Sequence, residues 1–166
     1  MVVYPDSSKH NWNDCHKNAT FPAKLENIDD MGFIHALIER LVREHGIDTK
    51  HVFVLGYSNG GQMAFRLAVE KPDEVAAVAA LGPNLPTPDS SSCAQQGRTA
   101  RVMLANGTLD AIDPYEGGKV TIFGFGYRNR HDPAARPECA QRSHRCEPWN
   151  GLSAEKPKCE WSTMFF

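Results

Sequence analysis

The sequence has no apolar run near the roughly 20 residues needed to cross a bilayer, and its start lacks the basic and hydrophobic regions of a signal peptide. It also has no long basic run outside its C-terminal stretch, and its 18 lysines and arginines are slightly outnumbered by 20 aspartates and glutamates. We therefore expect neither a membrane nor a nucleic acid as partner, and no export signal within the chain itself.

Two nucleotide-binding patterns are also missing, G-x-G-x-x-G and a Gly-Lys-Ser/Thr loop, and no cofactor is expected. Cysteine is scarce and odd in number, so at least one of the five must stay unpaired or pair between molecules if the others form disulfides. The five are Cys15, Cys93, Cys139, Cys146 and Cys159. A zinc site from Cys139, His144, Cys146 and Cys159 would have suitable ligand types but not the usual C-x-x-C spacing, so no metal site is expected.

The 166 residues, 41% of them hydrophobic, suit one globular domain. Apolar residues recur at helical spacing from Phe33 to Val42, after the acids Asp29 and Asp30 and before Gly46, which predicts an amphipathic helix. A second helix is predicted from Met63 until before Pro72. Four apolar runs predict buried strands: 1–4, 52–55, 75–81 and 102–105. The alternation predicts an α/β fold with a mainly parallel sheet and flanking helices, in which the strand at 52–55 is covered on both faces.

The composition changes at about Arg128, where aliphatic residues become rare and Arg, His, Pro and Cys accumulate. This stretch shows neither strand alternation nor helical spacing. We therefore expect a core over residues 1–127 and an irregular or poorly packed tail over residues 128–166.

The segment from Gly56 to Gly60 reads G-x-S-x-G, the nucleophile elbow of α/β-hydrolases, and it lies between a predicted strand and a predicted helix. The tight turn should lift the hydroxyl of Ser58 clear of the sheet, with glycines on both sides where a Cβ would collide with neighbouring backbone. The amide of Asn59, at the start of the helix, could stabilise an oxyanion. The alternative is a glycine-rich turn that merely closes a crossover.

A serine nucleophile needs a base, usually a histidine oriented by an acid, and in this fold the chain order is Ser, acid, His. Asp110 follows the strand at 102–105 and is the candidate acid, although it could instead be a turn residue. Only His131 and His144 follow it, both in the irregular tail. His144 has the more usual separation and is the candidate base, although either could be an exposed tail histidine.

The chain resembles secreted bacterial polyhydroxybutyrate depolymerases and the related feruloyl and acetylxylan esterases. The resemblance rests on Val2–Asp6, Trp12–Asp14, Asp29–Ile34, Gly56–Ala64, Asn106–Asp110 and Pro114–Gly118. It implies a shortened α/β-hydrolase core, Ser58 as nucleophile, Asp110 as triad acid, and a secreted or periplasmic location.

The chain also departs from that family. Family members have an earlier strand ending in His-Gly that supplies another oxyanion donor, and a later His-Thr-Trp-Pro-like segment that carries the base. Asn106 replaces a histidine common in the family. The tail resembles the product of a reading-frame change or a truncated reading frame.

The sequence therefore predicts a serine carboxylic-ester hydrolase that acts on small acyl or aryl esters, or a polymeric ester, through an acyl-enzyme. The alternative is an impaired hydrolase remnant that forms homodimers through an open sheet edge.

Overall fold

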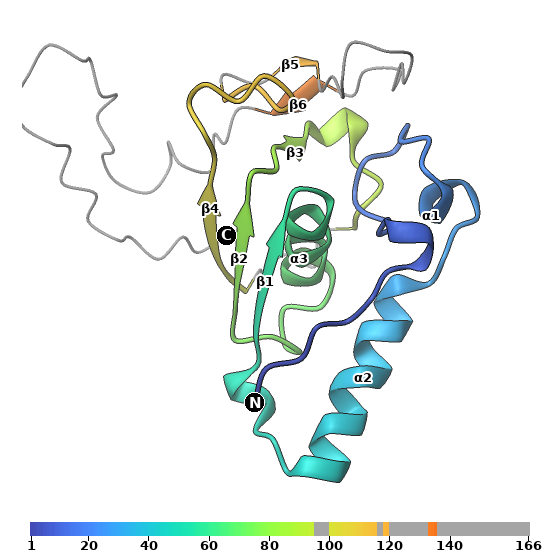
Figure 1. Ribbon diagram of the computed structural model, residues 1–166, viewed down its shortest axis with the longest axis vertical. Coiled ribbons are helices and arrows are strands. Elements are labelled where there is room, and N and C mark those ends of the chain that lie inside the picture. The colour runs from blue at the N-terminus through green and yellow to red at the C-terminus, as the bar shows by residue number, and fades with distance from the viewer. Residues whose placement is uncertain (95–99, 116–117, 120–132, 136–166) are drawn as a thin grey trace, which may run out of the picture.

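The computed structural model describes residues 1–94, 100–115, 118–119 and 133–135 (Figure 1). Its main sheet contains β1 (Phe53–Tyr57), β2 (Ala77–Leu81) and β4 (Arg101–Ala105), in the order β1-β2-β4 and all parallel. Tyr57, Leu81 and Ala105 are register partners at the carboxyl ends of these strands. The predicted parallel sheet is confirmed, and its strands all end at one edge.

The longest helix is α2 (Asp30–His45), and its two ends are fixed by local signals. The Asp29 side chain accepts a hydrogen bond from the Gly32 N–H at 2.9 Å, which caps the first turn. Gly46 ends the helix in the left-handed conformation, with φ of 63°. The helix predicted from apolar spacing is confirmed.

The second long helix, α3 (Asn59–Glu70), follows β1 and lies against one face of the sheet (Figure 1). It contributes Met63, Ala64, Leu67 and Ala68 to a buried apolar cluster. That cluster also contains side chains of α2, of β2 and β4, and of the residues just before these strands, namely Met31, Ile34, Ile38, Val75, Val78, Ala100 and Val102. The hydrophobic core therefore joins α2, α3 and one face of the sheet.

The opposite face of β1 was expected to be covered and is not. Phe53, Leu55 and Tyr57 are 69%, 70% and 75% exposed. Alternate residues of a strand point to opposite faces, so these three share the face away from α3. Within the described ranges, β1 is covered on one side only, and the prediction of a strand buried on both faces is wrong there.

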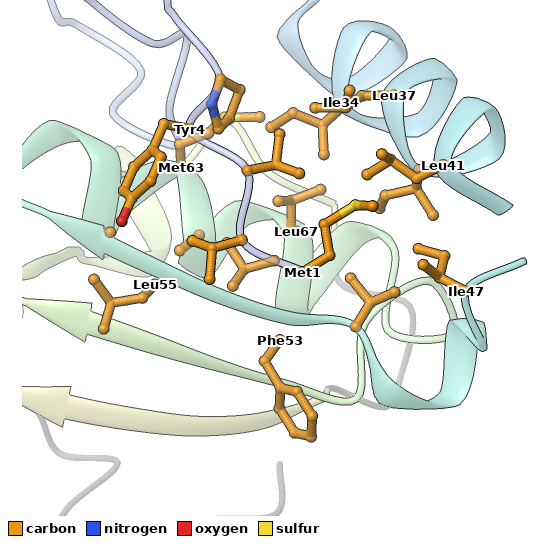
Figure 2. A pocket seen from close by; sticks show the side chains of 18 of the residues that line it. Met1, Tyr4, Ile34, Leu37, Leu41, Ile47, Phe53, Leu55, Met63 and Leu67 are labelled. Atoms are coloured by element: carbon orange, nitrogen blue, oxygen red, sulfur yellow. The ribbon is translucent and has the colours of Figure 1, made fainter. Parts of the chain in front are cut away.

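The strand predicted at residues 1–4 is also wrong, because that segment has no regular structure. Met1, Val2 and Tyr4 are 77%, 75% and 91% exposed, and no described strand pairs with them. The segment lines one part of an apolar groove of about 890 Å³, which is also lined by α2, β1 and α3. Figure 2 shows Met1 and Tyr4 among the side chains that line this groove, together with Leu41 of α2 and Leu55 of β1.

A second, small antiparallel sheet has the order β3-β6-β5, formed by β3 (Leu85–Pro86), β5 (Gly118–Lys119) and β6 (Pro133–Ala135). Residues 133–135 lie in the stretch 128–166 that was predicted to be irregular, and the rest of that stretch lies outside the described residues, so the division at residue 127 stays a prediction. Their backbone finds pairing partners in β3 and β5, which a reading of local composition does not reveal.

Four short helices complete the described part: α1 (Pro22–Leu25), η1 (Ser8–His10), η2 (Thr49–His51) and η3 (Pro88–Ser90). A disulfide joins Cys15 to Cys93, with 5.1 Å between their Cα atoms. The other three cysteines lie outside the described residues. No helix in the described ranges is both long and apolar enough to span a membrane.

Candidate active site

Ser58 occupies the turn between β1 and α3, at the carboxyl edge of the main sheet. Its φ of 52° and ψ of −124° lie outside the regions that non-glycine residues favour, so the turn holds this residue in a strained conformation. The side chain makes no capping hydrogen bond to α3, and the residue is exposed. Its N–H donates to the Leu81 carbonyl at 2.8 Å, which fixes the strained peptide to the neighbouring strand β2.

The glycines of the elbow meet different demands. A Cβ on Gly56 would lie 2.0 Å from the Gly60 carbonyl oxygen, so a side chain is excluded there. A Cβ on Gly60 would meet nothing closer than the Trp12 ring nitrogen at 3.9 Å. Gly61 is the crowded second glycine, because its Cβ would lie 2.9 Å from Pro83. The steric prediction is thus confirmed for Gly56 and wrong for Gly60, whose place Gly61 takes.

Asn59, the candidate oxyanion residue, is the first residue of α3. Amides in the first turn of a helix have no intrahelical acceptor, and they carry the positive end of the helix dipole. The Asn59 side chain is engaged elsewhere, in hydrogen bonds to Trp12 and Asp14. The residue can therefore offer its backbone N–H, but not its side chain, to a developing negative charge beside Ser58.

Asp110 lies in the loop that follows β4. One of its carboxylate oxygens, Oδ1, accepts hydrogen bonds from the Ile112 and Asp113 amides at 2.9 and 3.0 Å. The hydrogen bonds from the Asp113 and Ile112 amides lower the pKa of Asp110, so this carboxyl is ionised at neutral pH. A carboxylate in this state can orient and stabilise a histidinium, as a triad acid must.

Asn106 makes two side-chain hydrogen bonds at the start of the same loop. Its Nδ2 donates to the Pro83 carbonyl and to Asn84 Oδ1, both at 2.8 Å. These bonds tie the segment after β4 to the segment after β2. The carboxyl ends of β1, β2 and β4 are adjacent, so Ser58 and Asp110 both lie at one edge of the sheet.

The candidate base, His144, lies outside the described residues, as does His131. Within the described ranges, no hydrogen bond joins a histidine to Ser58 or to Asp110. The five described histidines lie elsewhere: His10 ends η1, His16 is buried against Asp14, His35 and His45 lie on α2, and His51 precedes β1. The described part of the chain therefore brings the candidate nucleophile and the candidate acid to one edge of the sheet, and no described histidine is hydrogen-bonded to either.

Three buried polar residues near this edge were not singled out as site residues by sequence: Asp14, His16 and Asp113. Asp14 lies in Trp12–Asp14, one of the segments on which the family resemblance rests, but the resemblance does not predict the hydrogen bonds of its side chain. Burial raises the pKa of Asp113, while hydrogen bonds from Asn84 and the nearby His16 ring oppose that rise. In the described ranges, no group of three or more His, Cys, Asp or Glu side chains could hold a metal ion.

A family model for the alpha/beta hydrolase fold matches residues 2–120. "Putative esterase NocK" of Nocardia uniformis subsp. tsuyamanensis is 34% identical over 88 residues, which cover 53% of this chain and 25% of that protein. "Probable feruloyl esterase C" of Aspergillus niger (strain ATCC MYA-4892 / CBS 513.88 / FGSC A1513) is 28% identical over 129 residues, which cover 76% of this chain and 46% of that protein.

The chain thus spans less than half the length of these two curated relatives. No solved structure matches it. The family match covers well over half of the chain and includes both β1 with its serine turn and β4 with its acidic loop. The chain therefore belongs to the α/β-hydrolase fold family.

Proposed function

We propose that this protein is a serine carboxylic-ester hydrolase, with Ser58 as nucleophile, Asp110 as acid, His144 as base and the Asn59 amide as oxyanion donor. The observation that carries the proposal is the strained backbone of Ser58, held between β1 and α3 with its hydroxyl free of a capping bond. Such strain persists only where the surrounding structure maintains it, and it is typical of functional sites. The relatives whose names describe esterases support the same class of reaction.

In this mechanism the base removes the hydroxyl proton as Ser58 Oγ bonds to the ester carbonyl carbon. The carbonyl oxygen takes the negative charge and accepts the Asn59 N–H. The alcohol leaves with the proton returned by the base, and the acyl group stays on Ser58. Water then attacks the acyl-enzyme by the same steps and releases the acid and free Ser58.

The substrates we propose are small acyl or aryl esters. A polymeric ester of the polyhydroxybutyrate kind is a further candidate, from the sequence resemblance.

The Cys15–Cys93 disulfide supports a secreted or periplasmic location, because disulfides persist in oxidising compartments.

The test compares p-nitrophenyl acetate hydrolysis by the wild type and by Ser58→Ala, together with fluorophosphonate labelling read by mass spectrometry. We expect the variant to lose about a thousandfold or more in kcat and to take no label. Equal turnover by the two proteins, or a label on another residue only, would overturn the proposal.

Self-association through β1 is a second proposal, with a second copy of this chain as the partner. One observation favours it: on the side away from β2, no described strand pairs with β1, and Phe53, Leu55 and Tyr57 are exposed beside that edge. Light scattering should show a dimer that Leu55→Lys converts to a monomer. A wild type that is monomeric at every concentration tested would exclude it.

A further inference from the structure

The side chain of Asn59 is held by three hydrogen bonds from a segment far away in the sequence. The Trp12 N–H donates to Asn59 Oδ1 at 2.6 Å. Asn59 Nδ2 donates to the Trp12 carbonyl at 3.1 Å and to Asp14 Oδ2 at 2.8 Å. Both ends of this amide are therefore fixed, directly beside the nucleophile.

Asp14 is the charged member of this arrangement and is fully buried, with 0% of its surface exposed. Its Oδ2 accepts from Asn59, and its Oδ1 accepts from the His16 backbone N–H at 2.8 Å. His16 Nδ1 lies 3.3 Å from the same Oδ1. A buried carboxylate is costly unless donors surround it. Each carboxylate oxygen of Asp14 therefore has a hydrogen-bond donor.

The segment that carries Asp14 is anchored independently of Asn59. The Asn13 N–H donates to the buried carboxylate of Asp30 at 2.6 Å, and Arg66 Nη1 donates to the Asn13 carbonyl at 2.6 Å. The neighbouring residue Cys15 is cross-linked to Cys93. Attachment of this segment to the fold does not require Asn59. The three hydrogen bonds that hold the Asn59 side chain, which we call the clamp, therefore call for another explanation.

That explanation lies in the peptide of Asn59. The orientation of its side chain restricts the Cα and hence the direction of its backbone N–H. An oxyanion donor acts only when it points to the place where the charge develops, about 3 Å away. We propose that Asp14, supported by His16, is a positioning residue that aims the Asn59 N–H at the oxyanion formed on Ser58, an inference that rests on the proposed function.

The decisive variant is Asp14→Asn, which removes the charge and replaces one carboxylate oxygen with an NH₂ group. That NH₂ group would face another donor, either Asn59 Nδ2 or the His16 N–H. Asp30→Asn is the matched control: Asp30 is also buried and contacts the same segment through Asn13, but has no bond to Asn59. We expect Asp14→Asn to lower kcat for p-nitrophenyl acetate about ten- to a hundredfold, as small displacements of catalytic groups do, with KM changed less than about twofold. Asp30→Asn should keep kcat within about threefold of the wild type.

A second readout does not depend on activity. In nitrogen-15 NMR spectra, the Asn59 amide resonance should shift and its hydrogen exchange should accelerate in Asp14→Asn, but not in Asp30→Asn. If Ser58→Ala hydrolyses the ester as fast as the wild type, the proposed function fails, while the amide measurement still decides on the positioning. Should Asp14→Asn not fold, Asn59→Ala removes the same clamp from the helix side, and its amide at position 59 should exchange faster.

The inference is overturned if the position-59 amide exchanges at the wild-type rate in the folded variant, or if Asp14→Asn keeps wild-type kcat. It is also overturned if Asp30→Asn produces the same losses, since the clamp would then only help to hold the segment in place.

Discussion

Gly56 of β1 and Gly60 of α3 approach so closely that a Cβ on Gly56 would lie 2.0 Å from the Gly60 carbonyl oxygen and 2.6 Å from the Gly61 nitrogen. Both opposing atoms belong to backbone, so they cannot rotate away as a side chain could. The contact fixes how sharply the chain turns from strand to helix, and Ser58 lies at the turn.

This contact predicts that Gly56→Ala is strongly destabilising. Relief of the overlap requires the helix to move away from the strand, and we expect a cost of about 3 kcal/mol or more in the free energy of unfolding. Gly60→Ala is the control, because the nearest atom to its new methyl group would be 3.9 Å away. Urea unfolding should find Gly60→Ala within about 1 kcal/mol of the wild type. Equal stability of the two variants would contradict the contact.

The Cys15–Cys93 disulfide predicts a redox-dependent stability. It spans 78 positions of sequence, and closure of so long a loop lowers the entropy of the unfolded chain. The chain-entropy estimate is about 4.5 kcal/mol, and measured losses on removal of native disulfides are about 2–5 kcal/mol. Dithiothreitol should lower the urea midpoint accordingly. A double variant, Cys15→Ala with Cys93→Ala, should be similarly destabilised, and a large further response to dithiothreitol would implicate other cysteines.

The elements that sequence predicted well have signals that are local. The Asp29 cap, the apolar spacing over α2 and the left-handed Gly46 all lie within 18 consecutive residues. The serine turn could likewise be predicted from the sequence, since its motif, its strand and its helix are contiguous. These features need no knowledge of what packs against them.

The features that sequence missed depend on distant partners. An apolar run at residues 1–4 becomes a strand only if another strand pairs with it, and no described strand does. The hydrogen bond from Asn59 to Asp14 joins residues 45 positions apart, and no spacing rule predicts it. The exposed face of β1 likewise depends on what covers the sheet, because apolar residues alone do not state whether a second layer exists.

The assignment of the base to His144 makes a selective prediction. If His144 activates Ser58, His144→Ala should lose nearly as much kcat as Ser58→Ala, since members of a triad act as a unit. His131→Ala is the control within the same tail and should retain wild-type kcat. Loss of activity in His131→Ala with none in His144→Ala would reassign the base. Wild-type activity in both variants would remove both tail histidines from the mechanism.

Asp113 and Asp110 are two carboxyls of one loop whose pKa values are shifted in opposite directions. Burial raises the pKa of Asp113 above the ordinary 3.8, so this group favours the folded state below pH 3.8 and loses that contribution as pH rises through its folded pKa. Asp113→Asn removes the charge while its amide oxygen can still accept the Asn84 N–H, which Asp113 accepts at 2.9 Å. The melting temperature of Asp113→Asn relative to the wild type should therefore increase from pH 3.5 to pH 7.

Asp110 should behave in the opposite way. Hydrogen bonds from the Asp113 and Ile112 amides lower its pKa, so its stabilising contribution is present above pH 3.8 and is lost as pH falls through its folded pKa. Asp110→Asn should thus melt below the wild type at pH 7, with a difference that shrinks on acidification. Melting curves followed by circular dichroism from pH 3 to pH 7 measure both slopes. Slopes of the same sign would show that burial of Asp113 does not set its protonation, because the two carboxyls share one loop and differ in their surroundings.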